Sequence, residues 1–220
     1  MNEAALQGIA RQLSHPQGEE GLKVAANMKI GNGSMIQRTI DLLACESNNT
    51  VLEIGPADGG YVPYLLSRAP HLKYYGIDIS ETMIAQARQQ HAALISHGMA
   101  SFTLGNGREL PYDDNFFNKV YTVNTLYFWE EPLDYANEIL RVLKPGGKFY
   151  LTFAEKDFMK ALPFTVYGFR LYDINDAERL LSDAGFLIAD VKTKTEDIKS
   201  NTGEAVKRNF IILTSAKPFS

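Results

Sequence analysis

The sequence predicts an α/β fold: a doubly wound, mostly parallel seven-stranded sheet with a late antiparallel strand. Three observations point to this fold. Short apolar runs alternate with helical patterns from residue 50 onward, the first run ends in a glycine turn, and two late apolar runs are separated only by a polar loop. Alternating strands and helices are typical of parallel sheets, whereas two successive strands with a short loop are typical of an antiparallel pair.

The expected strands are short apolar segments, most of them bounded by glycine or polar residues. They cover residues 50–54, 73–80, 100–106, 116–124, 148–153, 187–194 and 208–217. Five of them belong to the β/α alternation, and the last two form the late antiparallel edge pair.

The expected helices carry start and stop signals. Pro63 fits the first turn of a helix over 61–69, because its missing N–H would be unbonded there. Ser80 caps a helix over 81–96. An amphipathic helix is expected over 132–143, ended by Lys-Pro-Gly-Gly at 144–147, and a further helix over 173–186 with Gly185 after its end.

The N-terminal segment stands outside this alternation. Residues 1–39 are interpreted as a helical cap that folds across the carboxyl edge of the sheet, in which Gly31 and Gly33 interrupt the helical pattern. The alternative is a lead-in helix with no function. Residues 40–220 then form the sheet domain, with a lid-like insertion at about 155–172, where the sequence is aromatic and irregular.

Composition excludes several function classes. The net charge of −4 provides no basic field for nucleic acid, and the basic stretch 192–208 is interrupted by acidic residues, as in a solvated face. The single cysteine, Cys45, rules out a disulfide framework and is expected as a buried, inert thiol in a helix. The start of the chain does not resemble a signal peptide, and no apolar run is long enough for a membrane span. We expect a cytoplasmic protein with no membrane contact.

The glycine turn after the first strand predicts a ligand site. Gly55 and Gly59 let the backbone turn sharply and approach a ligand closely. Glu53 lies near the end of a buried strand, where a carboxylate is costly unless it binds something. Asp78 ends the second strand, where it can accept both hydroxyls of a ribose.

The turn also fits the dinucleotide pattern G-x-A-x-x-G over residues 55–60. Asp58 within the turn and Glu53 before it add negative charge beside any pyrophosphate. A neutral or cationic nucleoside therefore suits the turn better than a dinucleotide.

Four motifs in order carry a family resemblance: "VLEIGPADGGY" (51–61), "YYGIDIS" (74–80), "FTLGNGRELPYDDNFFNKVYTVNTLYFW" (102–129) and "EILRVLKPGGKFYLTF" (138–153). Together they resemble the class I S-adenosylmethionine-dependent methyltransferases, over about residues 40–215. The resemblance implies a Rossmann-like fold, methyl transfer and S-adenosylmethionine as cofactor. It implies the methionine half on Glu53, Gly55, Ala57 and Gly59, the ribose on Asp78 and Ile79, the adenine on Asn106, Gly107 and Arg108, and the methyl sulfonium beside Asn124.

The chain departs from the family pattern at two positions. Ala57 replaces the middle glycine of the turn, and Asn106 replaces the usual acid beside the adenine. An amide still offers both a donor and an acceptor to the adenine edge. Structural alternatives stay open: Glu53 as a cap of the turn amides, Asp78 as a helix-capping acid, and Asn106-Gly107 as a turn dipeptide.

The acceptor is expected to be a small molecule, largely apolar or planar. Aromatic residues follow the fourth expected strand and recur over 164–172, although they could simply pack a lid. The candidate pocket residues are Met28, Asn32, Tyr127, Trp129 and Tyr167. Residues 124–127 read Asn-Thr-Leu-Tyr and lack the prolines of the motif that methylates amino groups of nucleic-acid bases.

A general base is needed only when the acceptor atom carries a proton at neutral pH. No side chain stands out as a base, and His15 and Tyr127 are the candidates with a suitable position. His71, His91 and His97 lie in or beside predicted helices and are expected at the surface. No metal site is expected.

Two other functions stay open. A protein of this fold could hold the nucleoside without turnover, as a sensor or an assembly subunit. An NAD-dependent oxidoreductase would account for G-x-A-x-x-G and Asp78, but no Tyr-x-x-x-Lys pair suited to hydride transfer is recognisable.

Overall fold

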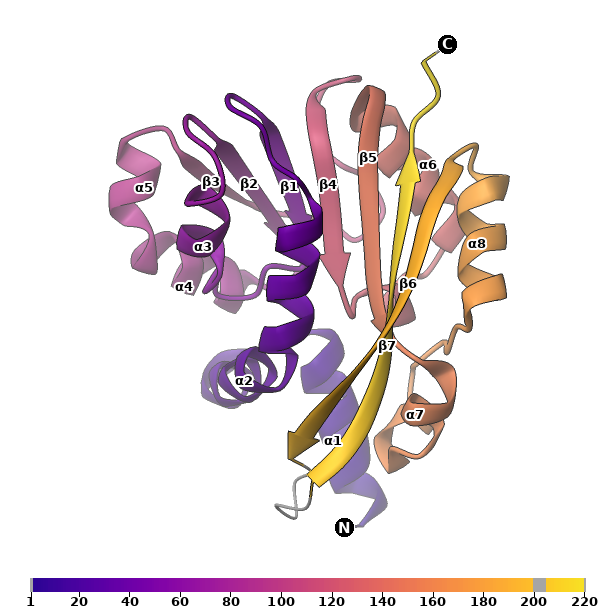
Figure 1. Cartoon of the computed structure of the whole chain (residues 1–220). Coiled ribbons are helices and arrows are strands. Elements are labelled where there is room, and N and C mark those ends of the chain that lie inside the picture. The colour runs from indigo at the N-terminus through magenta and orange to yellow at the C-terminus, as the bar shows by residue number, and fades with distance from the viewer. Residues whose placement is uncertain (1, 200–204, 220) are drawn as a thin grey trace.

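Seven strands form a sheet in the order β3-β2-β1-β4-β5-β7-β6 in the computed structural model, which describes residues 2–199 and 205–219 (Figure 1). The strands are β1 (Thr50–Ile54), β2 (Lys73–Asp78), β3 (Ala100–Leu104), β4 (Phe117–Val123), β5 (Leu143–Ala154), β6 (Leu187–Lys199) and β7 (Ala205–Ala216). The helices are α1 (Glu3–Ser14), α2 (Gly18–Leu42), α3 (Val62–Leu66), α4 (Glu81–Gln90), α5 (Ala92–Ser96), α6 (Pro132–Val142), α7 (Lys156–Lys160) and α8 (Ile174–Asp183), with short 3-10 turns η1 (Leu126–Phe128) and η2 (Pro163–Val166).

The pairing confirms the predicted fold class. Strands β1 to β5 pair in parallel, and β7 lies antiparallel between β5 and β6. The chain runs from β1 outward through β2 to β3, and then returns to the other side of β1 with β4. In such sheets the crevice beyond the carboxyl ends of the strands, beside this reversal, is where ligands bind.

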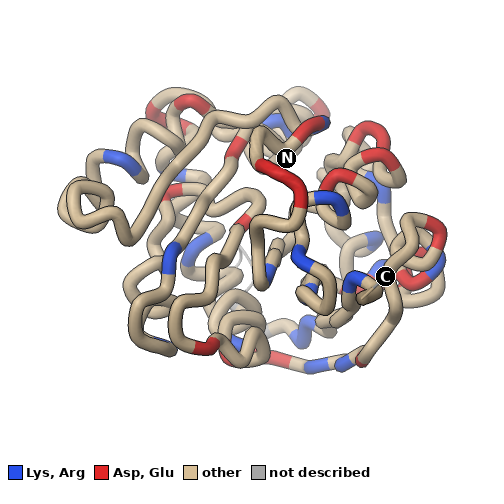
Figure 2. The backbone as a smooth tube through the Cα atoms, turned by 90° about the horizontal axis from the view of Figure 1, so that it is seen from above, with Lys and Arg blue, Asp and Glu red and all other residues tan. Residues whose placement is uncertain are grey.

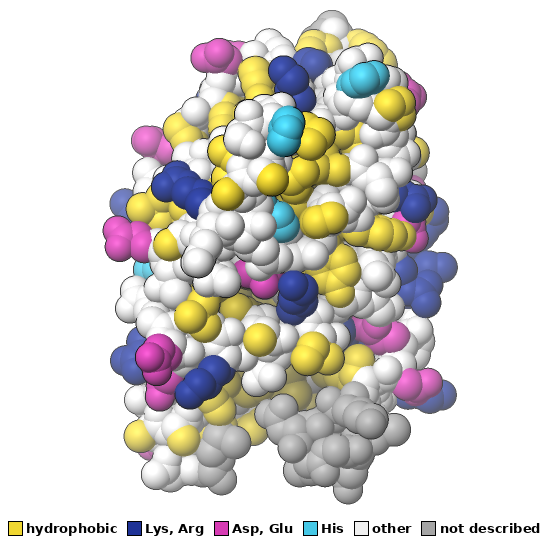
Figure 3. Space-filling model, turned by 90° about the vertical axis from the view of Figure 1, so that its left-hand side faces the viewer, with side chains coloured by type: hydrophobic (Ala, Val, Ile, Leu, Met, Phe, Trp, Pro, Cys, Tyr) yellow, Lys and Arg dark blue, Asp and Glu magenta, His cyan; other side chains and the backbone are white. Residues whose placement is uncertain are grey.

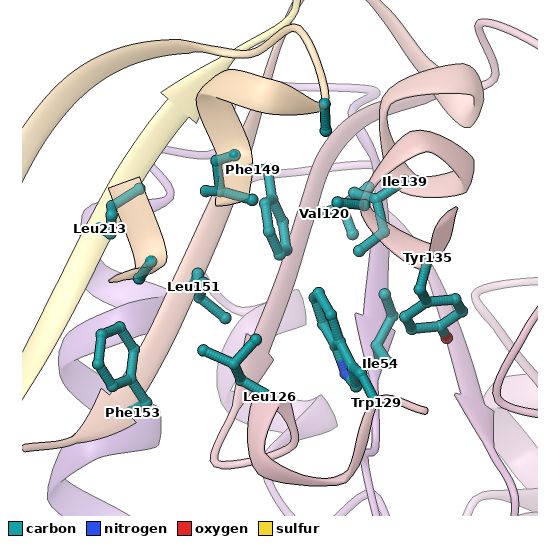
Figure 4. Close-up of a cluster of buried hydrophobic side chains, with 14 of the residues drawn as sticks. Ile54, Val120, Leu126, Trp129, Tyr135, Ile139, Phe149, Leu151, Phe153 and Leu213 are labelled. Carbon is teal, nitrogen blue, oxygen red and sulfur yellow. The ribbon is translucent and has the colours of Figure 1, made fainter. Parts of the chain in front are cut away.

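Both faces of the sheet are covered by helices. Helices α3 and α4 and the end of α2 pack on one face, and α6 and α8 pack on the other. The side chains of β1 are divided between the two faces accordingly: Val51 packs with α3 and α4, whereas Leu52 and Ile54 pack with α6 and α8. Figure 4 shows the core between the sheet and α6 and α8, in which Trp129 and Tyr135 lie beside Ile54.

Helices α1 and α2 lie at the carboxyl ends of the strands (Figure 1). The expected interruption of α2 at Gly31 and Gly33 is wrong, because α2 runs unbroken through both. Gly33 lies against the Tyr61 hydroxyl, where a side chain would clash. Tertiary packing of this kind overrides the low helix propensity of glycine. The domain boundary predicted after residue 39 falls within α2, and it stays a prediction.

The turn between α1 and α2 is anchored on the start of α4. Ser80 caps α4 as predicted, accepting a hydrogen bond from the Met83 amide at 3.1 Å, and its hydroxyl donates to the Pro16 carbonyl. The Gly18 amide donates to the Thr82 hydroxyl at 3.1 Å. The two N-terminal helices are thereby fastened beside the end of β2.

The final hairpin is longer than expected. Strand β5 pairs with β7 only as far as Phe210, whereas β6 and β7 continue to pair with each other out to Lys199 and Ala205. This extension reaches the region of α1 (Figure 1). Alternating charged residues such as Glu196 and Arg208 hid it in the sequence, because they resemble a solvated loop.

Three local expectations are corrected. The helix expected over 81–96 breaks at His91, which is buried and stacks on Phe102 instead of lying at the surface. Cys45 lies beyond the end of α2 and is only half-buried. The segment 144–147 belongs to β5, with a register irregularity opposite β4, and is not a separate turn.

Charged side chains of both signs are interspersed along the backbone (Figure 2). The side that carries α4 and α5 likewise mixes apolar, basic and acidic groups (Figure 3). None of the described helices has the length and apolar character to cross a membrane. The expected cytoplasmic location stays a prediction.

Candidate functional site

A cavity of about 170 Å³ lies beyond the carboxyl ends of β1, β2 and β4. We call it the first cavity. Helices α1 and α2 close one side of it, and the turn after β1 forms another. Its lining includes Leu13, Pro16, Met28, Lys29, Asn32, Glu53, Gly55, Ala57, Asp58, Asp78, Ile79, Gly107, Asn124, Phe128, Trp129 and Tyr135.

The turn after β1 has an unusual backbone. Gly55, Ala57 and Gly59 all have positive φ, at 75°, 49° and 68°. A side chain on Gly55 would meet the Thr125 methyl group, so glycine is required there. Gly59 faces Phe102 and His91 and does not line the cavity. Its glycine serves the packing of the turn onto α4 and β3.

Asp78 shapes this turn and faces the first cavity. Its carboxylate accepts hydrogen bonds from the Ala57 amide at 3.1 Å and the Ser80 amide at 2.9 Å. Burial raises the pKa of Asp78, and these two amides oppose the rise because they stabilise the charged form. A carboxylate can accept further hydrogen bonds, so Asp78 can hold a ligand hydroxyl as well as the turn.

Glu53 is buried at the end of β1. The Tyr74 hydroxyl donates to its carboxylate at 2.7 Å. Gly76, which is opposite Glu53 in β2, leaves the space for this contact. Burial raises the pKa of Glu53 to about 7, against the effect of the tyrosine hydrogen bond. A nearby cation would favour the charged form of this group.

Lys29 is a lining residue that the sequence interpretation missed. Its ammonium group reaches from α2 over Gly60 and pairs with Asp58 at 3.3 Å. Because Lys29 and Asp58 are far apart in the sequence, no local sequence pattern predicts their pairing. Lys29 adds one positive charge to a cavity wall that otherwise carries the three carboxylates of Glu53, Asp58 and Asp78.

Two residues predicted beside the adenine lie outside the lining. The Asn106 side chain accepts from the Arg108 and Glu109 amides, both at 2.9 Å, which is the turn geometry of the structural alternative. Arg108 is exposed and pairs with Glu130 at 2.7 Å. Ile79 and Gly107, from the same predicted group, do line the first cavity.

A second cavity of about 280 Å³ adjoins the first. Leu13, Met28, Asn32, Asn124 and Phe128 line both cavities and form the boundary between them. The rest of the second cavity is lined by Tyr127, Ala154, Phe158, Met159, Leu162, Phe164, Phe169, Ile198, Val206 and Arg208. Thus η1, the segment after β5 and the extended hairpin all contribute to it.

The residues predicted to bind the methyl acceptor do not all line the same cavity. Met28, Asn32 and Tyr127 line the second cavity. Trp129 lines the first cavity, and its indole N–H donates to the Thr125 hydroxyl at 3.2 Å. Tyr167 is half-buried and lines neither cavity.

The two candidate bases have other surroundings. The Tyr127 hydroxyl is buried, donates to the Asn124 side-chain oxygen at 3.0 Å and accepts from the Ala154 amide at 2.7 Å. Burial raises the pKa of Tyr127 far above its ordinary value. His15 follows α1 on the side of Asp78 and lines neither cavity. Neither geometry suits proton abstraction in the second cavity.

Arg208 is a buried cation on the extended hairpin. Its Nε donates to Glu196 at 2.8 Å, one Nη donates to the Asn32 side-chain oxygen at 3.0 Å, and the other donates to the Gly31 carbonyl at 2.6 Å. This network joins β6 and β7 to the middle of α2. The sequence interpretation missed it, because Arg208 was assigned to a solvated face.

Comparison with known proteins identifies the type of domain. Residues 52–151 match the family model described as a methyltransferase domain. The chain is 28% identical over 130 residues to YdaC, an uncharacterized methyltransferase of Bacillus subtilis, and 36% identical over 104 residues to a demethylmenaquinone methyltransferase of Symbiobacterium thermophilum. The matched stretches cover 59% and 47% of this chain, and 70% and 40% of those proteins.

Solved structures share the fold. The Haloferax volcanii protein solved in complex with the methyltransferase activator Trm112 superposes with a TM-score of 0.75 at 18% identity, covering 97% of each chain. A SAM-dependent methyltransferase from Aquifex aeolicus superposes with a TM-score of 0.65 at 18% identity, covering 96% of this chain and 98% of its own.

A seven-stranded sheet with an antiparallel β7, a glycine turn after β1 and a methyltransferase domain over its centre define an α/β methyltransferase. Residues 52–151 match a methyltransferase domain, and the fold of the chain is that of the class I S-adenosylmethionine-dependent methyltransferases. The predicted fold class, enzyme class and cofactor are thereby confirmed.

The residues of the first cavity fit this cofactor chemically. Asp78 provides a hydrogen-bond acceptor for ribose hydroxyls, and Ile79 and Trp129 provide apolar surface for a base. Glu53 suits the cationic part of an amino acid, whereas Lys29 suits its carboxylate. The donors and acceptors of the cavity therefore match both ends of S-adenosylmethionine.

Proposed function

We propose that the protein transfers a methyl group from S-adenosylmethionine to a small-molecule acceptor. The observation that carries the proposal is the junction of the two cavities at Asn32, Asn124 and Phe128. When bound, the cofactor supplies an electrophilic methyl group on a sulfonium. A site of this kind accelerates the reaction chiefly by orienting the acceptor and excluding water.

The chain's own residues divide this work. Asp78 holds the ribose hydroxyls, and Glu53 and Lys29 hold the amino acid part. Leu13 of α1 and Met28 and Asn32 of α2 line the junction of the cavities, where they limit the access of water to the reacting atoms. Asn124 lies at the junction with a positive φ of 59°, a strained conformation of the kind found at functional sites.

Two observations support a small acceptor. The second cavity has a volume of only about 280 Å³ and is bounded by α1, α2 and the extended hairpin. One relative is named for a small-molecule acceptor, demethylmenaquinone. Basic and acidic residues are interspersed along the backbone (Figure 2) and the net charge is −4, a charge distribution that favours a small molecule over a nucleic acid as the acceptor.

Calorimetric titration with S-adenosylmethionine, S-adenosylhomocysteine and NAD tests the cofactor assignment. We expect the first two to bind with dissociation constants in the micromolar range, about −8 kcal/mol, and NAD not to bind. NAD binding without binding of the two sulfur nucleosides would contradict the proposal.

A further inference from the structure

Four polar side chains line the second cavity among the described residues: Asn32, Asn124, Tyr127 and Arg208. The other lining side chains are aliphatic, aromatic or thioether. The way in which these four side chains are already hydrogen-bonded decides which polar group a ligand must bring. A buried polar group without a partner is costly, so the ligand must complement the valences that remain.

Asn32 presents a donor to the junction of the cavities. Arg208 carries donors only, so the amide oxygen of Asn32 must be the atom that faces it, at 3.0 Å. The amide nitrogen is therefore turned away from Arg208. No partner for this nitrogen is present within residues 2–199 and 205–219, and Asn32 lines both cavities.

The acceptor atoms of the other side chains are occupied. The Asn124 oxygen accepts from the Tyr127 hydroxyl at 3.0 Å and the Ala154 amide at 3.1 Å. The Tyr127 hydroxyl itself accepts from the Ala154 amide. The charge of Arg208 is balanced by Glu196, and Arg208 retains one N–H beyond its bonds to Glu196, Asn32 and Gly31. The hydrogen-bonding groups of these side chains that remain free are thus donors.

The described part of the second cavity also offers no base. Among the described lining residues there is no carboxylate and no imidazole. An amine is protonated at neutral pH and would need both a base and an acceptor here. An oxygen that is already ionised needs neither, and it accepts hydrogen bonds from the free donors.

We propose that the methyl acceptor is an apolar molecule whose reacting atom is an ionised oxygen, as in a carboxylate or an acidic phenol, held by the Asn32 amide nitrogen. This inference rests on the proposed methyltransferase function. The oxygen lone pair forms a bond to the methyl carbon, and the carbon–sulfur bond breaks with its electron pair left on sulfur. A neutral ester or ether and a neutral thioether result, and no proton is removed.

The test measures binding, which does not require turnover. Protein loaded with S-adenosylhomocysteine is titrated with decanoate, 4-nitrophenolate, decylamine and decanol in a calorimeter. We expect decanoate or 4-nitrophenolate to bind about ten-fold or more tightly than decylamine, since a hydrogen bond to a charged oxygen is worth at least this factor. The two anions separate the carboxylate from the phenol source.

Asn32→Asp is the informative variant. It keeps an oxygen for Arg208, removes the free donor and adds a negative charge at the junction. We expect decanoate to bind about ten-fold or more weakly and decylamine to bind more tightly. A merely structural role of Asn32 would weaken both ligands alike. Asn137→Asp, on the exposed side of α6, is the matched control and should change neither.

The outcomes distinguish a failure of the proposed methyltransferase function from a failure of the inference about the acceptor. Failure of S-adenosylhomocysteine to bind would overturn the proposed function and this inference with it. Binding of S-adenosylhomocysteine together with a preference for decylamine, or for decanol over both anions, would overturn the inference alone. Detection of methyl decanoate or 4-nitroanisole after addition of S-adenosylmethionine would support both.

Discussion

The two cavities are built in different ways. The first cavity lies at the ends of β1, β2 and β4, so its carboxylates, Glu53, Asp58 and Asp78, belong to the sheet or to the turn after β1, whereas Lys29 comes from α2. The second cavity is made by α1, α2, the segment after β5 and the hairpin extension, which meet only through tertiary contacts. The sheet thus positions the carboxylates of the candidate cofactor site directly, whereas Lys29 and the acceptor side depend on tertiary contacts such as the Arg208 network.

The largest expected effect comes from removing that network. In Arg208→Ala, Glu196 is left as a buried charge without its partner; the two side chains are 7% and 8% exposed. We expect the opening free energy of the amides at the outer ends of β6 and β7 to fall by about 3–5 kcal/mol. Native-state hydrogen exchange measures it.

The exposed pair Arg108–Glu130 provides the control for this prediction. Arg108→Ala should change stability by less than about 1 kcal/mol, because both side chains are largely in solvent. An equal fall of protection in β1 and in the hairpin of Arg208→Ala would contradict the view that the network serves the acceptor side.

A second effect concerns pH and the first cavity. Folding raises the pKa of Glu53 from 4.5 to about 7, so the folded state binds more protons than the unfolded state between these values. The stability contributed by neutral Glu53 is complete below pH 4.5 and is lost as the pH rises through 7. The loss approaches about 3 kcal/mol by linkage, and it is expected without ligand.

Glu53→Gln tests this effect. Glutamine keeps an oxygen for the Tyr74 hydroxyl and does not titrate. Urea unfolding at pH 5 to 8 should show a stability that falls with pH more steeply in the parent protein than in the variant. Identical pH profiles would place the charge of Glu53 in a better-compensated environment than its burial indicates.

The smallest effect of the three concerns Asp78. Asp78→Ala should weaken S-adenosylmethionine binding by about 1.5–3 kcal/mol, the range for hydrogen bonds to a charged group. Calorimetry measures the loss, and Asp183→Ala, an exposed aspartate at the end of α8, is the control. Unchanged affinity in Asp78→Ala would remove the ribose role from this residue.

Predictability divides between residues placed by the sheet and residues placed by distant contacts, and this division does not coincide with that between the two cavities. Glu53 and Asp78 were predictable as neighbours, because the carboxyl ends of adjacent parallel strands meet at one edge of a sheet. The fold class followed from strand and helix alternation. Ala57 kept the positive φ of the turn that a glycine would favour.

The remainder depended on distant contacts. Lys29 pairs with Asp58, and Arg208 donates to Asn32, although the partners are far apart in the sequence. No periodic pattern in the sequence predicts such contacts. The continuity of α2 was missed for a similar reason, since Gly33 breaks a helical pattern but is needed beside Tyr61. Asn106 and Arg108 were assigned by resemblance, and locally they form a turn and an exposed ion pair.

The most direct test of two adjoining cavities is a crystal structure of the protein with S-adenosylhomocysteine and decanoate. We predict that the ribose lies on Asp78 and that the decanoate carboxylate lies within hydrogen-bond distance of the Asn32 amide nitrogen, with its chain among the aromatic residues of the second cavity. A nucleoside bound away from Asp78, or a carboxylate bound away from Asn32, would contradict the account.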